Sequence, residues 1–376
     1  MREYLLVLAI AAAVTYLATP AVRRLASRLG AITAFRERDI HVRPIVKLGG
    51  LALMAGIISG VLLASKLPFL SRVEEVATDS RALLIGGLIM FAVGALDDIV
   101  ELDWLSKLAG SVVAAGAMVV LGVQFYWLPL PGRDTFSLPP MLGAILAALL
   151  IIAMAQAVNF IDGLDGLAAG VCLIGALAFF SYSYLQAFTN SSNRALPAAL
   201  IMVAVAGACL GFLPHNMHPT RIFMGDSGAL PLGALMGGAT VNLTGFQPPT
   251  DGQPSWLPVL LPLILTIAVM AVPTLDLVLA VIRRTRAGRL PFSADQGHLH
   301  HRMLDMGHSH RTSVLLLWAW AAVVAFGVVL VGLIRGPWPV VAVAVAVVCC
   351  LVGTLVTPTR IRRRRRRRQR ERVRAA

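Results

Sequence analysis

Charged residues are scarce in this chain of 376 residues: 14% are Asp, Glu, Lys or Arg, whereas soluble domains carry about 25%. Hydrophobic residues make up 57% of the sequence. An ordinary soluble domain is therefore excluded. Cysteine is also rare, and the spacing of the four cysteines fits neither a metal site nor an extracellular disulfide framework. The sequence gives no indication of cysteine chemistry.

Long apolar runs recur along the chain, each near the length of about 20 residues that a helix needs to cross a bilayer. They predict about eleven transmembrane helices. These are centred near residues 12, 56, 89, 116, 149, 176, 204, 236, 269, 324 and 347. We expect an all-α polytopic membrane protein with one transmembrane catalytic domain at 1–357 and an Arg-rich tail at 358–376. The first run, Tyr4 to Ala18, is read as a retained helix because arginines and further spans follow it.

Basic residues fall mostly on one side of the predicted spans, which sets the orientation by the positive-inside rule. That rule predicts an N-terminus outside and a cytoplasmic C-terminus. All eight histidines then lie on the cytoplasmic side, so we expect the chemistry there. The tail holds eleven arginines between Arg360 and Arg374. In so apolar a chain they are expected to contact anionic lipid headgroups, and no nucleic-acid partner is predicted.

Two carboxylate clusters follow predicted spans on this side. Asp97 and Asp98 are adjacent, and adjacent carboxylates repel unless a cation or a shared proton compensates. Oxygen ligands of this kind suit Mg²⁺ completed by substrate phosphates, although a solvated loop is the alternative. The second cluster interleaves Asn159, Asp162 and Asp165 with glycines, which permit a ligand to approach the backbone. It resembles a calcium loop only weakly, because the closing glutamate is absent.

Three further features complete the set. Asn216 is followed by Asp226 in a Gly-Asp-Ser-Gly stretch, which suits either a cation ligand or a simple helix cap. The longest cytoplasmic loop contains His298, His300, His301 and Arg302. Mixed histidine and arginine suit phosphate oxygens, with zinc as the rival reading. Asp276 lies inside a predicted span, where a carboxylate either neighbours a site or forms a hydrogen bond between helices.

Together these clusters indicate metal-assisted phosphoryl transfer at a membrane face. Two other classes remain open. A magnesium-dependent membrane prenyltransferase would not need the histidine loop and would release pyrophosphate. A transporter or flippase would place ionisable residues along a path through the membrane, whereas here only Asp276 lies deep.

The motifs also resemble a known family, the polyprenyl-phosphate N-acetylhexosamine-1-phosphate transferases of the WecA and MraY type. The matched elements are HVRPIVKLGG at 41–50, Asp97-Asp98, NFIDGLDG at 159–166, GFLPHNMHPTRIFMGDSG at 211–228 and HLHH at 298–301. The resemblance implies transfer of a sugar-1-phosphate from a UDP-sugar to polyprenyl phosphate at the cytoplasmic face of the bacterial plasma membrane. UMP is released, Mg²⁺ is required with Mn²⁺ as a substitute, and homodimers are common.

The resemblance also implies roles for individual residues. Asp226 matches the principal Mg²⁺ ligand, and Asp97 and Asp98 match a pair assigned to metal binding or to activation of the lipid phosphate. The other matched positions are Asn159, Asp162 and Asp165 for the nucleotide, Asn216 beside the site, His298, His300, His301 and Arg302 for the diphosphate, and Lys47 and Lys107 near the phosphates.

The histidine motif distinguishes branches of this family, since members that use the muramyl-pentapeptide nucleotide carry three consecutive histidines. HLHH instead resembles the N-acetylglucosamine branch, and RRTRAGR and GHSHR resemble its actinobacterial, decaprenyl-using members. We therefore expect UDP-GlcNAc as the donor and decaprenyl or undecaprenyl phosphate as the acceptor. Another UDP-N-acetylhexosamine is the alternative donor. A covalent aspartyl-phosphate intermediate is an alternative to direct attack.

Overall fold

The structure is a computed structural model. It describes residues 1–31, 45–128, 136–189, 195–245, 260–269, 285, 308–334 and 336–354. Asp276 and the segment His298 to Arg302 lie outside these ranges, as does the Arg-rich tail, so their predicted roles stay predictions.

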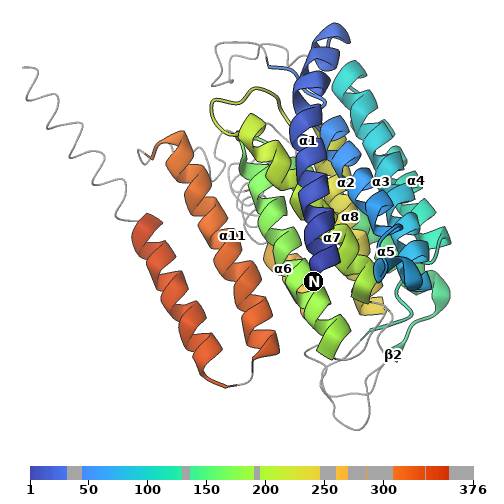
Figure 1. Cartoon of the computed structure of the whole chain (residues 1–376), viewed down its shortest axis with the longest axis vertical. Helices are drawn as coiled ribbons and strands as arrows, with labels where there is room; N and C mark the ends of the chain where they lie inside the picture. Colours follow the sequence, from blue (N-terminus) through green and yellow to red (C-terminus); the bar gives the residue numbers. More distant parts are fainter. Residues whose placement is uncertain are drawn as a thin grey trace, which may run out of the picture.

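The described chain is helical almost throughout (Figure 1). Its helices are α1 (Arg2–Arg28), α2 (Gly50–Ala64), α3 (Glu74–Val100), α4 (Trp104–Val120), α5 (Pro140–Ile161), α6 (Leu167–Thr189), α7 (Ala195–Asn216), α8 (Asp226–Gly245), Leu260–Val269, α11 (His310–Leu333) and Trp338–Thr354. A short 3-10 turn covers Leu70–Arg72. Strands β1 (Trp127–Leu128) and β2 (Phe136–Ser137) form a small antiparallel pair, which the sequence did not predict.

Each of the eleven predicted spans overlaps one of these helices, although the span centred near residue 269 is described only for residues 260–269, and the all-α prediction is confirmed. Six of the described helices are long and apolar enough to cross a bilayer: α1, α3, α5, α6, α7 and α11. The helices at 50–64, 104–120, 260–269 and 338–354 are apolar but shorter. The chain is accordingly a multi-pass membrane protein.

Helix α7 lies in the middle of the bundle (Figure 1), and nearly all its residues are buried. It packs against α6 on one side and α1 on the other. Close approach to α1 depends on Gly211, because a Cβ there would collide with the carbonyl oxygen of Ala12. The small-residue pairs Gly56 and Gly60 on α2, and Gly233 and Gly237 on α8, also face neighbouring helices at short range. Small residues at four-residue spacing let helix backbones approach closely, and these glycines serve that purpose.

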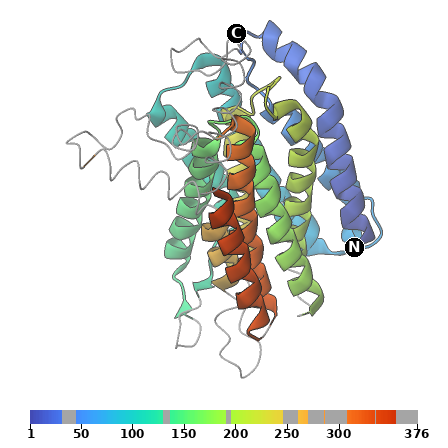
Figure 2. The ribbon, with the colours of Figure 1, turned by 90° about the vertical axis from the view of Figure 1, so that its left-hand side faces the viewer.

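Helix α11 and the helix Trp338–Thr354 form an antiparallel hairpin on one side of the bundle, next to α6 (Figures 1 and 2). Gly327 of α11 faces Val343, and the Trp320 indole donates a hydrogen bond to Thr354 Oγ1 at 3.2 Å. The last helix exposes most of its other apolar side chains. Such exposure is expected where lipid, rather than water, surrounds a helix.

Polar residues fix the helix ends from which the site is built. Asp103 caps α4, accepting the backbone N–H groups of Leu105 at 3.1 Å and Ser106 at 3.3 Å. The hydrogen bond from the Ser106 hydroxyl lowers the pKa of Asp103. Ser309 caps α11 through the N–H of Thr312. Helix α3 ends at Val100 because Glu101 adopts a left-handed conformation, with φ of 55°. The chain thus reverses sharply between α3 and α4.

Candidate active site

Asp97 and Asp98 occupy the last turn of α3, where both are almost fully buried. Successive residues on a helix are about 100° apart around the axis, since a turn takes about 3.6 residues. The two carboxylates therefore face different neighbours. Asp97 faces the start of α4, and Asp98 faces the start of α8.

Lys107 joins two of the carboxylates. Its Nζ lies 2.7 Å from Asp97 Oδ2 and 2.6 Å from Asp226 Oδ2. Asn159, near the end of α5, donates a further hydrogen bond from Nδ2 to Asp226 Oδ2 at 3.3 Å. The lysine side chain is 26% exposed, against 10% for Asp97 and 19% for Asp226. Four helices thus contribute to one charged cluster that water can reach.

Asp98 caps α8 from another helix. Its Oδ1 accepts the backbone N–H of Asp226 at 3.0 Å, and its Oδ2 accepts that of Ser227 at 3.1 Å. A carboxylate at a helix N-terminus satisfies free N–H groups and complements the helix dipole. Both oxygens of Asp98 therefore hold the backbone at the start of α8, and this contact orients the Asp226 side chain.

Two glycines make this contact possible. Gly225 has a φ of +69°, and a Cβ at this position would collide with the Asp98 carboxylate. Gly94 on α3 lies directly against the backbone carbonyl of Asp226, where a Cβ would also collide. Glycine is thus required at both positions by the close approach of α3 to the turn before α8.

Asp162 supports the same turn from α5, since its Oδ2 accepts the N–H of Gly225 at 3.1 Å. Part of the residue's surface stays exposed, but protein atoms surround the carboxyl group. That burial, together with the nearby charges of Asp98 and Asp226, raises the pKa of Asp162 to about 7. Asp162 is thus the carboxyl group beside the cluster that takes up a proton near neutral pH.

A second polar group lies beside the first. Asp165 Oδ2 pairs with His218 Nδ1 at 2.8 Å, and the His218 ring stacks on that of His310 with centroids 4.6 Å apart. Arg311 donates two hydrogen bonds to the His218 carbonyl. Asn216 is buried, accepts a hydrogen bond from the Gly166 N–H and donates one to the Ile222 carbonyl. It thereby holds the loop after α5 against the loop after α7.

Lys47 lies on a segment that pairs with the Asp226 turn. Phe223 N–H donates to the Val46 carbonyl, and Gly49 and Gly50 donate to the carbonyls of Phe223 and Met224. The structure therefore brings together Lys107, Asn159, Asp162, Asp226 and the Asp97-Asp98 pair, with Asp165 and Asn216 alongside.

Comparison with known proteins gives a consistent result. A sequence profile described as "Glycosyl transferase family 4" matches residues 80–244, the stretch that holds the whole carboxylate cluster. The decaprenyl-phosphate N-acetylglucosaminephosphotransferase of Mycobacterium tuberculosis is 46% identical over 87% of this chain and 82% of that protein. The protein of the same name from Mycolicibacterium smegmatis is 43% identical over 95% of this chain and 89% of its own length. This chain belongs to glycosyl transferase family 4.

A more distant relative supports the same family assignment. A probable undecaprenyl-phosphate N-acetylglucosaminyl 1-phosphate transferase of Bacillus subtilis is 33% identical over 80% of this chain and 77% of that protein. The resemblance noted from the motifs is confirmed by matches that extend far beyond those motifs.

The carboxylates fit the divalent cation expected for this family. One oxygen from each of Asp97, Asp98 and Asp226 lies within 4.8 Å of the others. Carboxylate oxygens are the ligands that Mg²⁺ prefers, completed by water and substrate phosphate. Because Asp98 already accepts two backbone N–H groups, Asp97 and Asp226 are the members best placed to hold a cation.

The motifs did not mark His218 as a site residue, and His310 and Arg311 stood only at the end of the histidine-arginine loop. In the structure His218 pairs with Asp165, His310 stacks on His218, and Arg311 bonds to the His218 carbonyl. The available signal was position: His218 follows Asn216 by two residues, and His310-Arg311 comes after the histidine loop. Only the fold shows that the start of α11 returns to this point.

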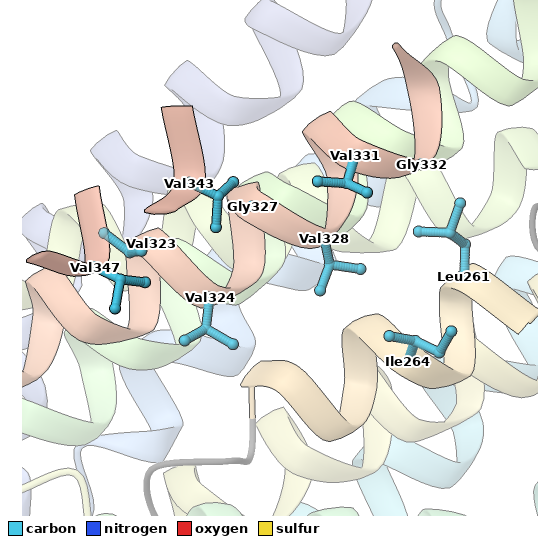
Figure 3. A pocket seen from close by; sticks show the side chains of 10 residues that line it. All are labelled: Leu261, Ile264, Val323, Val324, Gly327, Val328, Val331, Gly332, Val343 and Val347. Carbon is cyan, nitrogen blue, oxygen red and sulfur yellow. The ribbon is translucent and has the colours of Figure 1, made fainter. Parts of the chain in front are cut away.

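A separate apolar pocket of about 330 Å³ lies between the helix at 260–269, α11 and the helix at 338–354 (Figure 3). Its side chains include Ile264, Val324 and Val328, which point into a common space (Figure 3). It lies well along α11 from His310, roughly 20 Å at 1.5 Å per residue. The lining residues are apolar, so this pocket offers no side chain that could accept or donate a proton.

Proposed function

We propose that this chain transfers N-acetylglucosamine-1-phosphate from UDP-GlcNAc to decaprenyl phosphate, as the names of its mycobacterial relatives describe for the acceptor and the transferred group. The observation that carries the proposal is the 46% identity over 87% of the chain, which includes the whole carboxylate cluster. The reaction would begin the assembly of a lipid-linked cell-envelope polysaccharide.

We further propose that all eleven helices cross the membrane, with the N-terminus outside and the site at the cytoplasmic face. The support is the bias of Lys and Arg in the connections. The site also lies where α3, α5 and α7 end and where α4, α8 and α11 begin, as expected if alternate spans run in opposite directions. Cysteine labelling of connections on each side would test this orientation.

In the proposed reaction, an oxygen of the decaprenyl phosphate attacks the sugar-linked phosphorus of UDP-GlcNAc. The bond from that phosphorus to the bridging oxygen breaks, and UMP leaves. Asp97 and Asp226 would hold Mg²⁺, or Mn²⁺ in its place, which would supply positive charge to the diphosphate oxygens.

The described residues would divide the remaining work. Asp98 orients Asp226 by capping α8, and Lys107 attracts the acceptor phosphate. Asp97, whose Oδ2 faces Lys107, would orient that phosphate or accept its proton. Asn159, Asp162 and Asp165 lie where the nucleotide would bind, with Lys47 nearby. His298, His300, His301 and Arg302 would contact the diphosphate.

The direct test is turnover of radiolabelled UDP-GlcNAc by the purified protein with decaprenyl phosphate, with and without Mg²⁺. We expect lipid-linked product and UMP only when the metal is present. No lipid-linked product under either condition would refute the proposal. UDP-GalNAc in the same assay tests the donor sugar, and we expect little product from it. Light scattering of the detergent-solubilised protein would test whether it forms the expected homodimer.

A further inference from the structure

We propose that Lys107 is a resident cation that occupies the divalent-metal position until the metal displaces it, and that its released ammonium group then binds the acceptor phosphate. This inference rests on the proposed function for the identity of that phosphate. The exchange between lysine and metal rests on the geometry of the cluster alone.

The lysine occupies the place that a metal needs. Its Nζ is 2.7 Å from Asp97 Oδ2 and 2.6 Å from Asp226 Oδ2. A magnesium ion bound to the same two oxygens would lie about 2.1 Å from each. An ammonium group and a dication cannot both occupy the space between one pair of oxygens. Binding of the metal to this pair therefore requires Lys107 to leave.

The negative charge of the carboxylates explains why the Lys107 ammonium group lies between Asp97 and Asp226. Asp97 and Asp98 are almost fully buried and Asp226 largely so, and unpaired buried carboxylates cost several kcal/mol each. Within the described ranges, Lys107 is the basic side chain that forms ion pairs with Asp97 and Asp226. One ammonium group offsets one of the three negative charges, and a divalent ion offsets two. The lysine therefore neutralises the carboxylates in part, and a divalent ion at the same position neutralises them further.

The Lys107 side chain also has room to move away from the carboxylates. The Lys107 side chain is 26% exposed, more than either carboxylate with which it pairs, so it lies at the edge of the cluster. A lysine carries its charge on a flexible four-carbon stem and serves well as a phosphate ligand. Displacement by metal would thus release a phosphate-binding group at the edge of the site. Metal entry and acceptor binding would be coupled through one side chain.

The first experiment measures exposure of the amine without any substrate. The chain has three lysines, Lys47, Lys66 and Lys107, so acetylation of each is readily followed by mass spectrometry. Lys66 is exposed after α2 and serves as the reference. We expect saturating Mg²⁺ to raise the acetylation rate of Lys107 several-fold over that in EDTA, while the rate of Lys66 stays constant. An unchanged or lower rate at Lys107 would overturn the proposal.

The second experiment measures metal binding in variants. Lys107→Met should bind Mn²⁺ about tenfold more tightly than wild type, because the metal no longer competes with a bound ammonium group. It should also unfold at a lower temperature in EDTA and regain stability in Mn²⁺. Lys66→Met is the matched control, with wild-type behaviour expected.

If Lys107 were only a phosphate ligand, Lys107→Met would leave Mn²⁺ affinity and EDTA stability unchanged, and that result would refute the exchange. Neither measurement requires turnover. A protein that passes both tests but forms no lipid-linked product would overturn the proposed function and leave the exchange intact.

Discussion

Replacement of Asp98 tests whether this residue acts on the substrates or on the structure. Its carboxylate is 5% exposed and accepts the N–H groups of Asp226 and Ser227 at 3.0 and 3.1 Å. Asp98→Ala would leave both donors without this acceptor. A buried donor that loses its partner costs about 1–3 kcal/mol, so we expect a loss of about 2–6 kcal/mol of stability for the pair. Asp98→Asn keeps one acceptor oxygen and should lose about half as much.

The assay is unfolding of the protein in detergent, followed together with Mn²⁺ binding. The graded loss from wild type through Asp98→Asn to Asp98→Ala is the expected signature of a helix cap. Mn²⁺ affinity should fall in parallel, because Asp226 loses its orientation. Asp97→Asn is the matched control on the same turn of α3. This variant keeps an acceptor oxygen for the N–H of Leu102, which lies 2.9 Å from Asp97 Oδ1 in the wild type. It should bind Mn²⁺ more weakly than wild type but lose little stability. An Asp98→Ala protein with wild-type stability and Mn²⁺ affinity but no turnover would refute this reasoning and give Asp98 a chemical role.

Three further predictions follow from the same cluster. Asp226→Ala should lower turnover of UDP-GlcNAc by about 100-fold or more, since the transferring phosphate loses its cation; full activity would remove Asp226 from the metal site. Gly225→Ala should destabilise the protein by about 1–2 kcal/mol from its left-handed backbone alone, measured as a lower unfolding midpoint, and a neutral substitution would argue against the φ of +69°. For Asp162, the pKa of about 7 in the folded protein exceeds the value of about 3.9 in an unfolded chain. Its contribution to stability is therefore complete at pH 4 and is lost as pH rises through 7, so metal-free wild type should lose stability relative to Asp162→Asn over that range. Parallel pH profiles for the two proteins would contradict the raised pKa.

Much of the fold could be predicted from the sequence because the thickness of the bilayer sets the length of apolar helix needed to cross it. Every predicted span overlaps a described helix, including the short α4, whose start is fixed by Asp103. The small pair of strands was missed, since two-residue strands carry no periodic signal. The orientation in the membrane stays a prediction.

The site was predictable as a set of residues but less so in its internal arrangement. Sequence alone placed Asp97 and Asp98 together and left their roles open. Packing of Gly94 against the Asp226 carbonyl turns Asp98 toward α8 and Asp97 toward Lys107. Lys107 was assigned to phosphate from its position, whereas in the structure it lies on two carboxylates. Such distinctions depend on contacts between helices far apart in the chain, which local patterns do not encode.

The cap on α8 also bears on how the protein is made. Asp98 and the backbone it holds are separated by 128 residues, and several membrane spans lie between them. During synthesis, α3 is made long before α8 emerges from the ribosome. The Asp98 carboxylate therefore lacks the backbone N–H groups of α8 until that helix has been made. A chain that stops after α7 would carry Asp97, Asp98 and Lys107 without the residue they are arranged around. The charged cluster therefore forms only when insertion has reached the start of α8, and an incomplete chain left in the membrane would lack the Asp226 carboxylate that is proposed to hold the cation.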